Sequence, residues 1–296
     1  MFDLNRYLNE RAQLVESALA KCVDTPAGAV ARLPEAMRYS LLAGGKRLRP
    51  ILVLASCEAV GGSLAAAMDL ACAVEMIHTY SLIHDDLPCM DDDDFRRGRP
   101  TNHKVYGEAI ATLAGDALLT DAFKVLARAT GAGVASAVVL ETIAELAAAA
   151  GSAGMVGGQV IDLLGEGKSK TLEELEELHG KKTGALFLAS VRGGARMGGA
   201  SGAQIESLDA YARALGLAFQ VVDDLLDVQG NLEQMGKRTQ KDSERGKATY
   251  PAILGIERSI DLARELESRA HRALASFDER AIALRELATF VVERKL

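Results

Sequence analysis

Apolar residues recur three and four positions apart through nearly the whole chain, and this spacing limits the fold more than any other feature of the sequence. Examples are Leu4, Tyr7, Leu8, Leu14 and Val15, and again Leu208, Tyr211, Leu215, Phe219 and Val222. Such spacing places apolar side chains on one face of a helix, whereas strand-like alternation is nowhere sustained. Ala and Leu recur, only six Tyr and seven Phe are present, and Trp is absent. The sequence therefore predicts an all-α protein.

The same spacing, interrupted at Gly and Pro, sets the predicted helices. They cover residues 3–21, 32–43, 49–60, 64–87, 104–129, 133–150, 154–164, 171–198 with a break near Gly180, 203–229, 249–275 and 279–293. No Ser/Pro-rich linker, low-complexity tract or internal repeat divides the chain, so we predict a single domain over residues 1–296. Its Ala- and Gly-rich helices can approach closely, which favours a helical bundle around a deep central cavity.

The acidic charge of the chain excludes some partners. With 34 Lys and Arg against 41 Asp and Glu, the formal charge is −7, so a general binder of nucleic acid or anionic membranes is not expected. No transmembrane segment is predicted, because the longest charge-free run, 146–161, has 16 residues and four glycines. The N-terminus lacks the apolar core of a signal peptide, and the four cysteines form no CxxC pair. We predict a cytoplasmic protein without disulfides.

One acidic cluster does not look like a solvated surface. Six aspartates occupy the ten positions from Asp85 to Asp94, just after a helical pattern that carries His78. His78 and Asp85 are seven residues apart and share a helix face. Pro88 then ends the helix, because it lacks an N–H group, and Asp91 can fold back toward Asp85. Converging carboxylates repel each other unless a cation separates them, and their hard oxygens suit Mg²⁺. A merely solvated cluster is the alternative.

A second acidic cluster lies inside an apolar helical stretch. Asp223 and Asp227 are one turn apart on the same face, with Asp224 beside them, and no Lys or Arg within one turn neutralises them. Like charges at this spacing cost about 0.2–0.5 kcal/mol when exposed and more when buried. A metal ion is the simplest partner for these carboxylates.

Basic groups accompany both acidic clusters. They are Arg96, Arg97 and Arg99 after the first, Lys237, Arg238, Lys241 and Lys247 after the second, and Lys46, Arg47 and Arg49 in the run Gly-Gly-Lys-Arg-Leu-Arg-Pro of residues 44–50. The free amides and cations of that run suit an anion, although it is not a P-loop. Each basic run alone would be an ordinary surface patch. With the aspartates, they predict a site where metal ions bridge carboxylates to a diphosphate that Arg and Lys also bind.

These motifs, in this order, resemble those of the short-chain trans-prenyl diphosphate synthases, and most closely those of bacterial farnesyl diphosphate synthases. The resemblance covers about residues 35–255 and is carried by 44–50, His78, Asp85-Asp86-x₄-Asp91 with Arg96 and Arg97, Lys182-Thr183, Gln220, Asp223-Asp224-x₂-Asp227, Gly236-Lys237 and Lys241-Asp242. It implies the helical isoprenoid synthase fold, usually as a homodimer. It also implies Mg²⁺-dependent condensation of isopentenyl diphosphate with dimethylallyl or geranyl diphosphate, by ionisation, condensation and elimination.

The resemblance implies a role for each acidic motif residue. Asp85, Asp91 and Asp223 would ligate three Mg²⁺ ions. Asp86 would support the first pair, and Asp224 and Asp227 would lie near the third ligand, mainly outside direct coordination.

The resemblance likewise implies how the substrates are held. The allylic diphosphate would contact Arg96, Lys182 and Lys237, and isopentenyl diphosphate would contact Lys46, Arg49, His78 and Arg97. The oxygens of Thr183 and Gln220 would face the developing allylic cation. Gln159 and Asp162 match a further helix of the family, where a structural contact and a functional role are both open.

The length of the product should depend on the residues beneath the first aspartate motif. Tyr80, followed by Ser81, stands five residues before Asp85, about 7.5 Å along a helix. An inward-pointing ring there could form a cavity floor and stop the growing tail; ordinary core packing is the alternative. Family members with an aromatic residue near this position commonly make the fifteen-carbon product. We therefore predict farnesyl diphosphate.

Three other functions are weighed against this prediction. A geranylgeranyl diphosphate synthase would differ only in cavity depth. A class I terpene cyclase would usually carry Ser or Thr at position 227 and Glu at 231, where this chain has Asp227 and Asn231. A non-catalytic partner subunit commonly lacks one or both aspartate motifs, and this sequence has both.

The terminal Arg294 and Lys295 could close over the isopentenyl site or belong to a frayed helix end.

Overall fold

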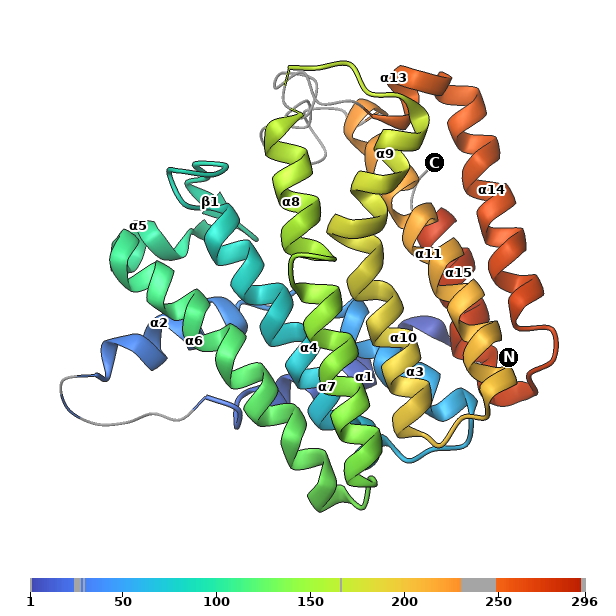
Figure 1. Ribbon diagram of the computed structural model, residues 1–296, viewed down its shortest axis with the longest axis horizontal. Coiled ribbons are helices and arrows are strands. Elements are labelled where there is room, and N and C mark those ends of the chain that lie inside the picture. Colours follow the sequence, from blue (N-terminus) through green and yellow to red (C-terminus); the bar gives the residue numbers. More distant parts are fainter. Residues whose placement is uncertain (1, 24–27, 29, 166, 230–248, 294–296) are drawn as a thin grey trace.

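Helices make up almost all of the secondary structure. The computed structural model describes residues 2–23, 28, 30–165, 167–229 and 249–293. Its longer helices are α1 (Leu4–Leu19), α2 (Arg32–Leu41), α3 (Leu48–Ala59), α4 (Leu64–Asp85), α6 (Glu108–Ala127), α7 (Ser136–Ala150), α8 (Met155–Leu164), α10 (Ala185–Met197), α11 (Gly202–Gln229), α14 (Ile256–Ala273) and α15 (Ile282–Glu293). In Figure 1, α4 runs through the middle of the bundle and packs against α3, α6 and α10. The predicted all-α class is confirmed.

Two predicted helices are each divided by a glycine. The predicted helix 104–129 is α5 (Asn102–Tyr106) followed by α6, and the predicted helix 249–275 is α13 (Tyr250–Leu254) followed by α14. Gly107 and Gly255 have φ angles of 84° and 82°, a left-handed conformation that glycine adopts without steric cost. Each glycine ends one helix and begins the next. The prediction of one continuous helix was therefore wrong at both places.

The predicted break near Gly180 is a π-helical turn. α9 (Leu172–His179) begins with a capping box between Thr171 and Glu174. It continues directly into the π-helix η2 (Gly180–Gly184) and then into α10. A π-helical turn widens the helix locally and often marks a functional site. Here it carries the predicted site residues Lys182 and Thr183.

A small hairpin and two short 3₁₀ turns complete the described elements. The strands β1 (Phe95–Arg96) and β2 (Arg99–Pro100) pair antiparallel, with Arg96 opposite Arg99. The turn residues Arg97 and Gly98 have φ angles of 53° and 74°. Two-residue strands are too short for a periodicity to reveal them. The 3₁₀ turns are η1 (Arg128–Ala132) and η3 (Glu279–Ala281).

Two hydrophobic clusters fill the bundle. One contains mainly residues of α1, α2, α4, α6 and α7, such as Met76, and the other mainly residues of α3, α10, α11, α14 and α15, such as Tyr211. Glycine allows close packing where α3 meets α10. A Cβ atom on Gly194 of α10 would lie 2.1 Å from the carbonyl oxygen of Val53 in α3, so the two backbones approach each other as the glycine content predicts.

One stretch, Ser136–Leu164, is long and apolar enough to cross a membrane by length and composition alone. In the structure it consists of two helices, α7 and α8, with residues 151–154 between them. The longer one, α7, has 15 residues, about 22 Å against a hydrocarbon core of about 30 Å. It packs against α6 and α10. Neither helix alone has the length of a membrane span.

Candidate active site

The first aspartate motif folds back on itself where α4 ends. Asp85 is the last residue of α4, and Pro88 lies in the turn that follows. The backbone N–H of Asp91 donates to the carbonyl oxygen of Asp85 at 2.8 Å. Burial raises the pKa of the Asp85 carboxyl, and Asp91 and Asp86 raise it further, while Lys182 opposes them. The predicted return of Asp91 to Asp85 is confirmed.

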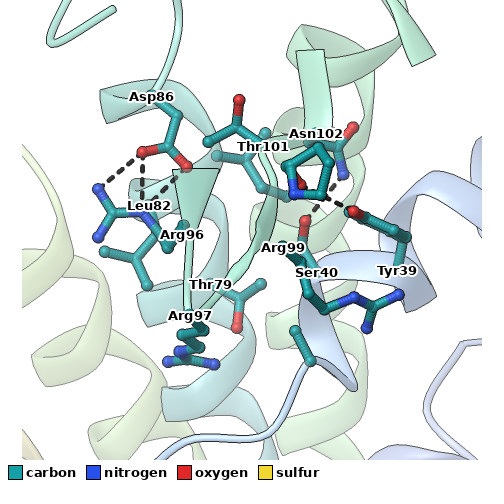
Figure 2. Close-up of a pocket in the computed structure, with 13 residues that line it drawn as sticks. Tyr39, Ser40, Thr79, Leu82, Asp86, Arg96, Arg97, Arg99, Thr101 and Asn102 are labelled. Atoms are coloured by element: carbon teal, nitrogen blue, oxygen red, sulfur yellow. Dashed lines mark hydrogen bonds and ion pairs between the residues drawn. The ribbon is translucent and has the colours of Figure 1, made fainter. Parts of the chain in front are cut away.

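Asp86 differs from its neighbour because it already holds a cation. Its carboxylate is only 3% exposed and accepts bonds from Nε of Arg96 at 2.7 and 3.0 Å, with Nη2 also at 2.7 Å. Figure 2 shows this pair at the hairpin. The structure therefore places Arg96 beside the motif, fixed by Asp86.

The hairpin is also held by contacts with α2. Figure 2 shows a small pocket, about 30 Å³, between α2, α4 and the hairpin. The hydroxyl of Tyr39 donates to the carbonyl oxygen of Pro100 at 2.8 Å, and the Arg99 guanidinium lies 4.4 Å from the centre of the Tyr39 ring. These contacts hold the strands that present Arg96 and Arg97.

The three aspartates of the second motif differ in how deeply they are buried. On α11, Asp223 is exposed and Asp227 half-buried, whereas Asp224 is buried. One Asp224 oxygen accepts from the backbone N–H of Tyr250 at 2.9 Å and the other from Nε2 of Gln220 at 3.1 Å. Asp224 thus joins α11 to α13. Burial lowers the pKa of Arg49 and the charge of Asp223 opposes this shift, so this carboxylate lies toward the predicted site.

The π-helix η2 and α8 carry four predicted polar residues, which contact one another, Asp85 of the first motif, and Gln220. The ammonium group of Lys182 lies 2.6 Å from the Asp162 carboxylate. Nε2 of Gln159 donates to Asp85 at 2.9 Å. The Thr183 hydroxyl lies 3.2 Å from Oε1 of Gln220, to which it donates.

These bonds bear on Gln159 and Asp162, for which the sequence left a structural contact and a functional role open. Each of them contacts a residue that the sequence assigned to the site, namely Asp85 and Lys182. The family motif was the signal that pointed to them. Periodicity alone could not, because α8 has polar residues that periodicity does not tell apart from solvated ones.

The loop before α3 has an unusual backbone. Gly44, Gly45 and Arg47 have φ angles of 78°, 124° and 49°. Arg97 donates through Nη1 to the carbonyl oxygen of Gly44. A Cβ atom on Gly45 would lie 2.8 Å from the Arg97 guanidinium carbon, so glycine is needed where the hairpin meets this loop. Lys46 is exposed at its tip.

Arg47 is placed differently from Lys46, which is exposed, and from Arg49, which lines a cavity. Its side chain is fully buried and donates to Glu16 of α1 at 2.7 Å, to Glu75 of α4 at 2.5 Å and to the carbonyl oxygen of Leu41 at 2.7 Å. The sequence counted it with the anion-binding cations. A lone Glu75 inside an apolar helix was the signal that a buried cation would be needed.

Cations crowd together near Arg49 and His78. The Arg49 guanidinium lies 5.0 Å from the centre of the Phe187 ring, and its buried Nε has no partner among the described residues. Burial lowers the pKa of Arg49, against the charges of Glu75 and Asp223. Burial lowers the pKa of His78 well below its usual value, and Arg49 and Arg97 lower it further. A neutral His78 surrounded by arginines forms an environment in which a bound anion would be stabilised.

A cavity of about 480 Å³ lies between α4 and α8. Its polar lining residues are Arg49, His78, Ser81, His84, Asp85, Gln159, Lys182 and Thr183, and its other lining residues are Tyr80, Leu82, Leu87, Cys89, Met90, Met155, Val156, Val160 and Leu163. Tyr80 is 5% exposed, and the Ser81 hydroxyl donates to the carbonyl oxygen of His78. The cavity therefore combines a charged part with an apolar one.

Some predicted residues cannot be placed. Lys237, Arg238, Lys241 and Lys247 lie outside the described residues, as do Arg294 and Lys295. Within the described part of the chain, no three His, Cys, Asp or Glu side chains are grouped closely enough to hold a metal ion. The donors nevertheless fit one: burial and, after it, the negative charge of Asp91 raise the pKa of Asp85, and Mg²⁺ prefers carboxylate oxygens.

Known proteins are similar to this chain in sequence and in fold. The Polyprenyl synthetase family matches residues 30–284. Farnesyl diphosphate synthase of Geobacillus stearothermophilus is 49% identical, over 98% of each chain. The large subunit 1 of a heterodimeric geranylgeranyl pyrophosphate synthase from Arabidopsis thaliana is 51% identical, over 99% of this chain and 80% of its own. The crystal structure of an FPP/GFPP synthase from Zymomonas mobilis superposes with a TM-score of 0.89 at 41% identity, over 98% of each chain. The predicted family and the isoprenoid synthase fold are thereby confirmed: the chain belongs to the polyprenyl synthetase family, whose members are prenyltransferases.

Proposed function

We propose that this prenyltransferase is a farnesyl diphosphate synthase. It condenses isopentenyl diphosphate head to tail with dimethylallyl or geranyl diphosphate and releases diphosphate. The observation that carries the product assignment is the buried ring of Tyr80 in the cavity below Asp85. The family carries the reaction class, and its relatives divide between fifteen- and twenty-carbon names.

The charged part of the cavity would hold the allylic diphosphate. Asp85, Asp91 and Asp223 would hold three Mg²⁺ ions, which supply positive charge to the leaving diphosphate when bound. Lys182, and Lys237 with it, would bind the diphosphate oxygens, and Arg96 is held near them by Asp86. Charge that develops on the leaving group is then stabilised more in the transition state than in the substrate.

Isopentenyl diphosphate would bind a second group of cations. Arg49, Arg97 and the exposed Lys46 supply charge, and His78, neutral because of its lowered pKa, donates one hydrogen bond. The Thr183 and Gln220 side chains, which contact each other, would direct oxygen atoms toward the allylic cation. No protein nucleophile or base is needed, since the double bond of isopentenyl diphosphate attacks the allylic cation and the released diphosphate can take the proton that is lost.

The apolar part of the cavity would exclude water and set the chain length. A carbocation exposed to water would give an alcohol, so apolar walls protect it. As each five-carbon unit is added, the tail descends past Asp85 until it reaches the Tyr80 ring. We further propose that residues 1–296 form one domain, that the chain acts as a cytoplasmic homodimer, and that prenyl diphosphates rather than nucleic acid are its partners.

A product assay tests this proposal. Purified protein is incubated with Mg²⁺, isopentenyl diphosphate and either dimethylallyl or geranyl diphosphate, and the products are separated by chromatography. We expect the fifteen-carbon product from the wild type, the same product from Tyr80→Phe, which keeps the ring, and longer products from Tyr80→Ala. An unchanged product from Tyr80→Ala would refute the floor, and no chain growth at all would refute the activity.

Geranylgeranyl diphosphate synthesis is the second candidate. It is favoured by relatives of that name at 49–51% identity across nearly the whole chain. A twenty-carbon main product from the wild type in the same assay would establish it instead. A non-catalytic partner subunit is disfavoured, because both aspartate motifs are present and the first contacts Gln159 of α8.

A further inference from the structure

His84 occupies a place that neither the motifs nor the proposed function explains. It lines the cavity beside Tyr80, four residues further along the same face of α4. The two rings meet nearly at right angles, with centres 5.8 Å apart and planes inclined at 76°. This edge-to-face arrangement is a favourable contact between aromatic rings. The imidazole is thus the direct neighbour of the proposed cavity floor.

The opposite side of the imidazole is bound to α6. Nε2 of His84 lies 3.0 Å from the carbonyl oxygen of Thr112. A carbonyl oxygen only accepts hydrogen bonds, so Nε2 carries the proton and donates it. Asp116, one turn further along α6, lies 3.9 Å from the same nitrogen. The ring is therefore fixed at both ends, by α6 and by Tyr80.

A glycine makes room for the ring. Gly115 is buried in α6 between these two residues, and a Cβ atom on it would lie 2.1 Å from Nε2 of His84. Glycine destabilises the middle of a helix relative to alanine, so its presence here calls for a packing reason. The imidazole of His84, which no larger residue at position 115 would admit, supplies that reason.

We propose that His84, seated on Gly115 and bonded to Thr112, is a positioning residue for product length: it holds the Tyr80 ring across the cavity. This inference rests on the proposed function, in which Tyr80 is the floor. The two rings share a helix face and an edge-to-face contact, so the imidazole blocks the space into which the Tyr80 ring could turn. Gly115 thereby fixes the depth of the cavity from outside it.

Replacing His84 and Gly115 should shift the product in opposite directions. His84→Ala removes the support, Tyr80 turns aside, and the ratio of twenty- to fifteen-carbon product rises several-fold. Gly115→Ala puts a methyl group where the His84 imidazole now packs against α6, so the imidazole is pushed toward the cavity. The cavity becomes shallower, and the ratio of ten- to fifteen-carbon product rises. The double variant has the methyl group but no imidazole, and should resemble His84→Ala.

Two further variants serve as controls. Gly131→Ala makes the same change at a glycine whose Cβ would meet nothing within 4 Å, and should leave the product ratio unchanged. His84→Gln keeps an N–H donor for Thr112 without the ring against Tyr80, and should give a ratio between wild type and His84→Ala. If circular dichroism shows that His84→Ala does not fold, the product ratio of His84→Gln tests the proposal in its place.

Tyr80→Ala belongs in the same assay, because it tests the floor directly. If Tyr80→Ala lengthens the product while His84→Ala and His84→Gln leave it unchanged, the role of His84 is refuted and the floor stands. If Tyr80→Ala also leaves it unchanged, the floor is refuted, and the inference with it. If His84→Ala and Gly115→Ala shifted the product in the same direction, the proposal that Gly115 positions the His84 ring would be refuted.

Discussion

The cavity has a charged part and an apolar part, and their side chains are held by different means. Around the charged part, ion pairs hold Arg96 to Asp86 and Lys182 to Asp162. In the apolar part, Tyr80 is held by packing, including the ring of His84. Ion pairs need particular residue types, whereas packing needs only suitable shape. Under the proposed function, the charged part would therefore determine the class of reaction, and the apolar part would determine the length of the product.

The largest expected effect comes from removing the carboxylates of the charged part. Asp85→Ala together with Asp223→Ala should lower the turnover number by about 10³-fold or more, because the developing charge on the leaving group loses its stabilisation. Steady-state kinetics at saturating Mg²⁺ measure this loss. Asp261→Ala, at an exposed position on α14, is the matched control and should keep wild-type turnover. Retained turnover in the double variant would support a non-catalytic subunit instead.

A second large effect is expected from the buried ion pairs behind the charged part. Arg47→Met leaves Glu75, which is 2% exposed, without its cation, and should cost about 3–5 kcal/mol of unfolding free energy. Urea titration measures this change. Adding Glu75→Gln should recover much of the stability. In that double variant the KM for isopentenyl diphosphate should rise about tenfold, near 1.4 kcal/mol, because Lys46 loses its fixed loop.

The KM for the allylic substrate should not change in the same variant. An equal rise in KM for both substrates would mean that Arg47 supports the whole bundle and not this loop. The charged part of the cavity would then not depend on this ion pair in particular.

A smaller effect of opposite sign is expected from Asp85→Asn. Because the folded protein raises the pKa of Asp85, mainly through burial, the ionised carboxylate destabilises the fold at neutral pH. The folded state gains stability as pH falls through this raised pKa. Without Mg²⁺ at pH 7, the variant should melt at a higher temperature than the wild type, and the difference should shrink in acid. An unchanged melting temperature would show that Gln159 and Lys182 fully compensate the charge.

The smallest effect is expected on the outer surface. Arg258 pairs with Glu265 on α14, and both side chains are about half exposed. Arg258→Ala should leave the unfolding free energy from a urea titration nearly unchanged, because water screens an exposed pair, and should leave the product unchanged. A loss comparable to that of Arg47→Met would contradict the view that burial gives the inner ion pairs their weight.

Much of the charged part could be predicted from the sequence. Asp85 and Asp91 fall on either side of a proline, so their convergence followed from local rules. The contacts of Gln159 and Asp162 depend on how α8 packs against η2, which one sequence does not reveal. The seat of His84 on Gly115 joins residues 31 positions apart in the chain, and periodicity carries no information about such pairs. The glycine breaks at 107 and 255 were missed because an isolated glycine need not end a helix.

The π-helix Gly180–Gly184 has a consequence for length changes in this chain. A π-helical turn holds about one residue more than an α-helical turn. Deleting one residue there would give a regular helix from α9 into α10 in which the two flanking helices keep nearly their present faces, and the residues within the turn would change direction. Lys182 would then turn away from Asp162 although the backbone became more regular. The segment should accept substitutions more readily than deletions, and its irregular turn keeps the register of the site.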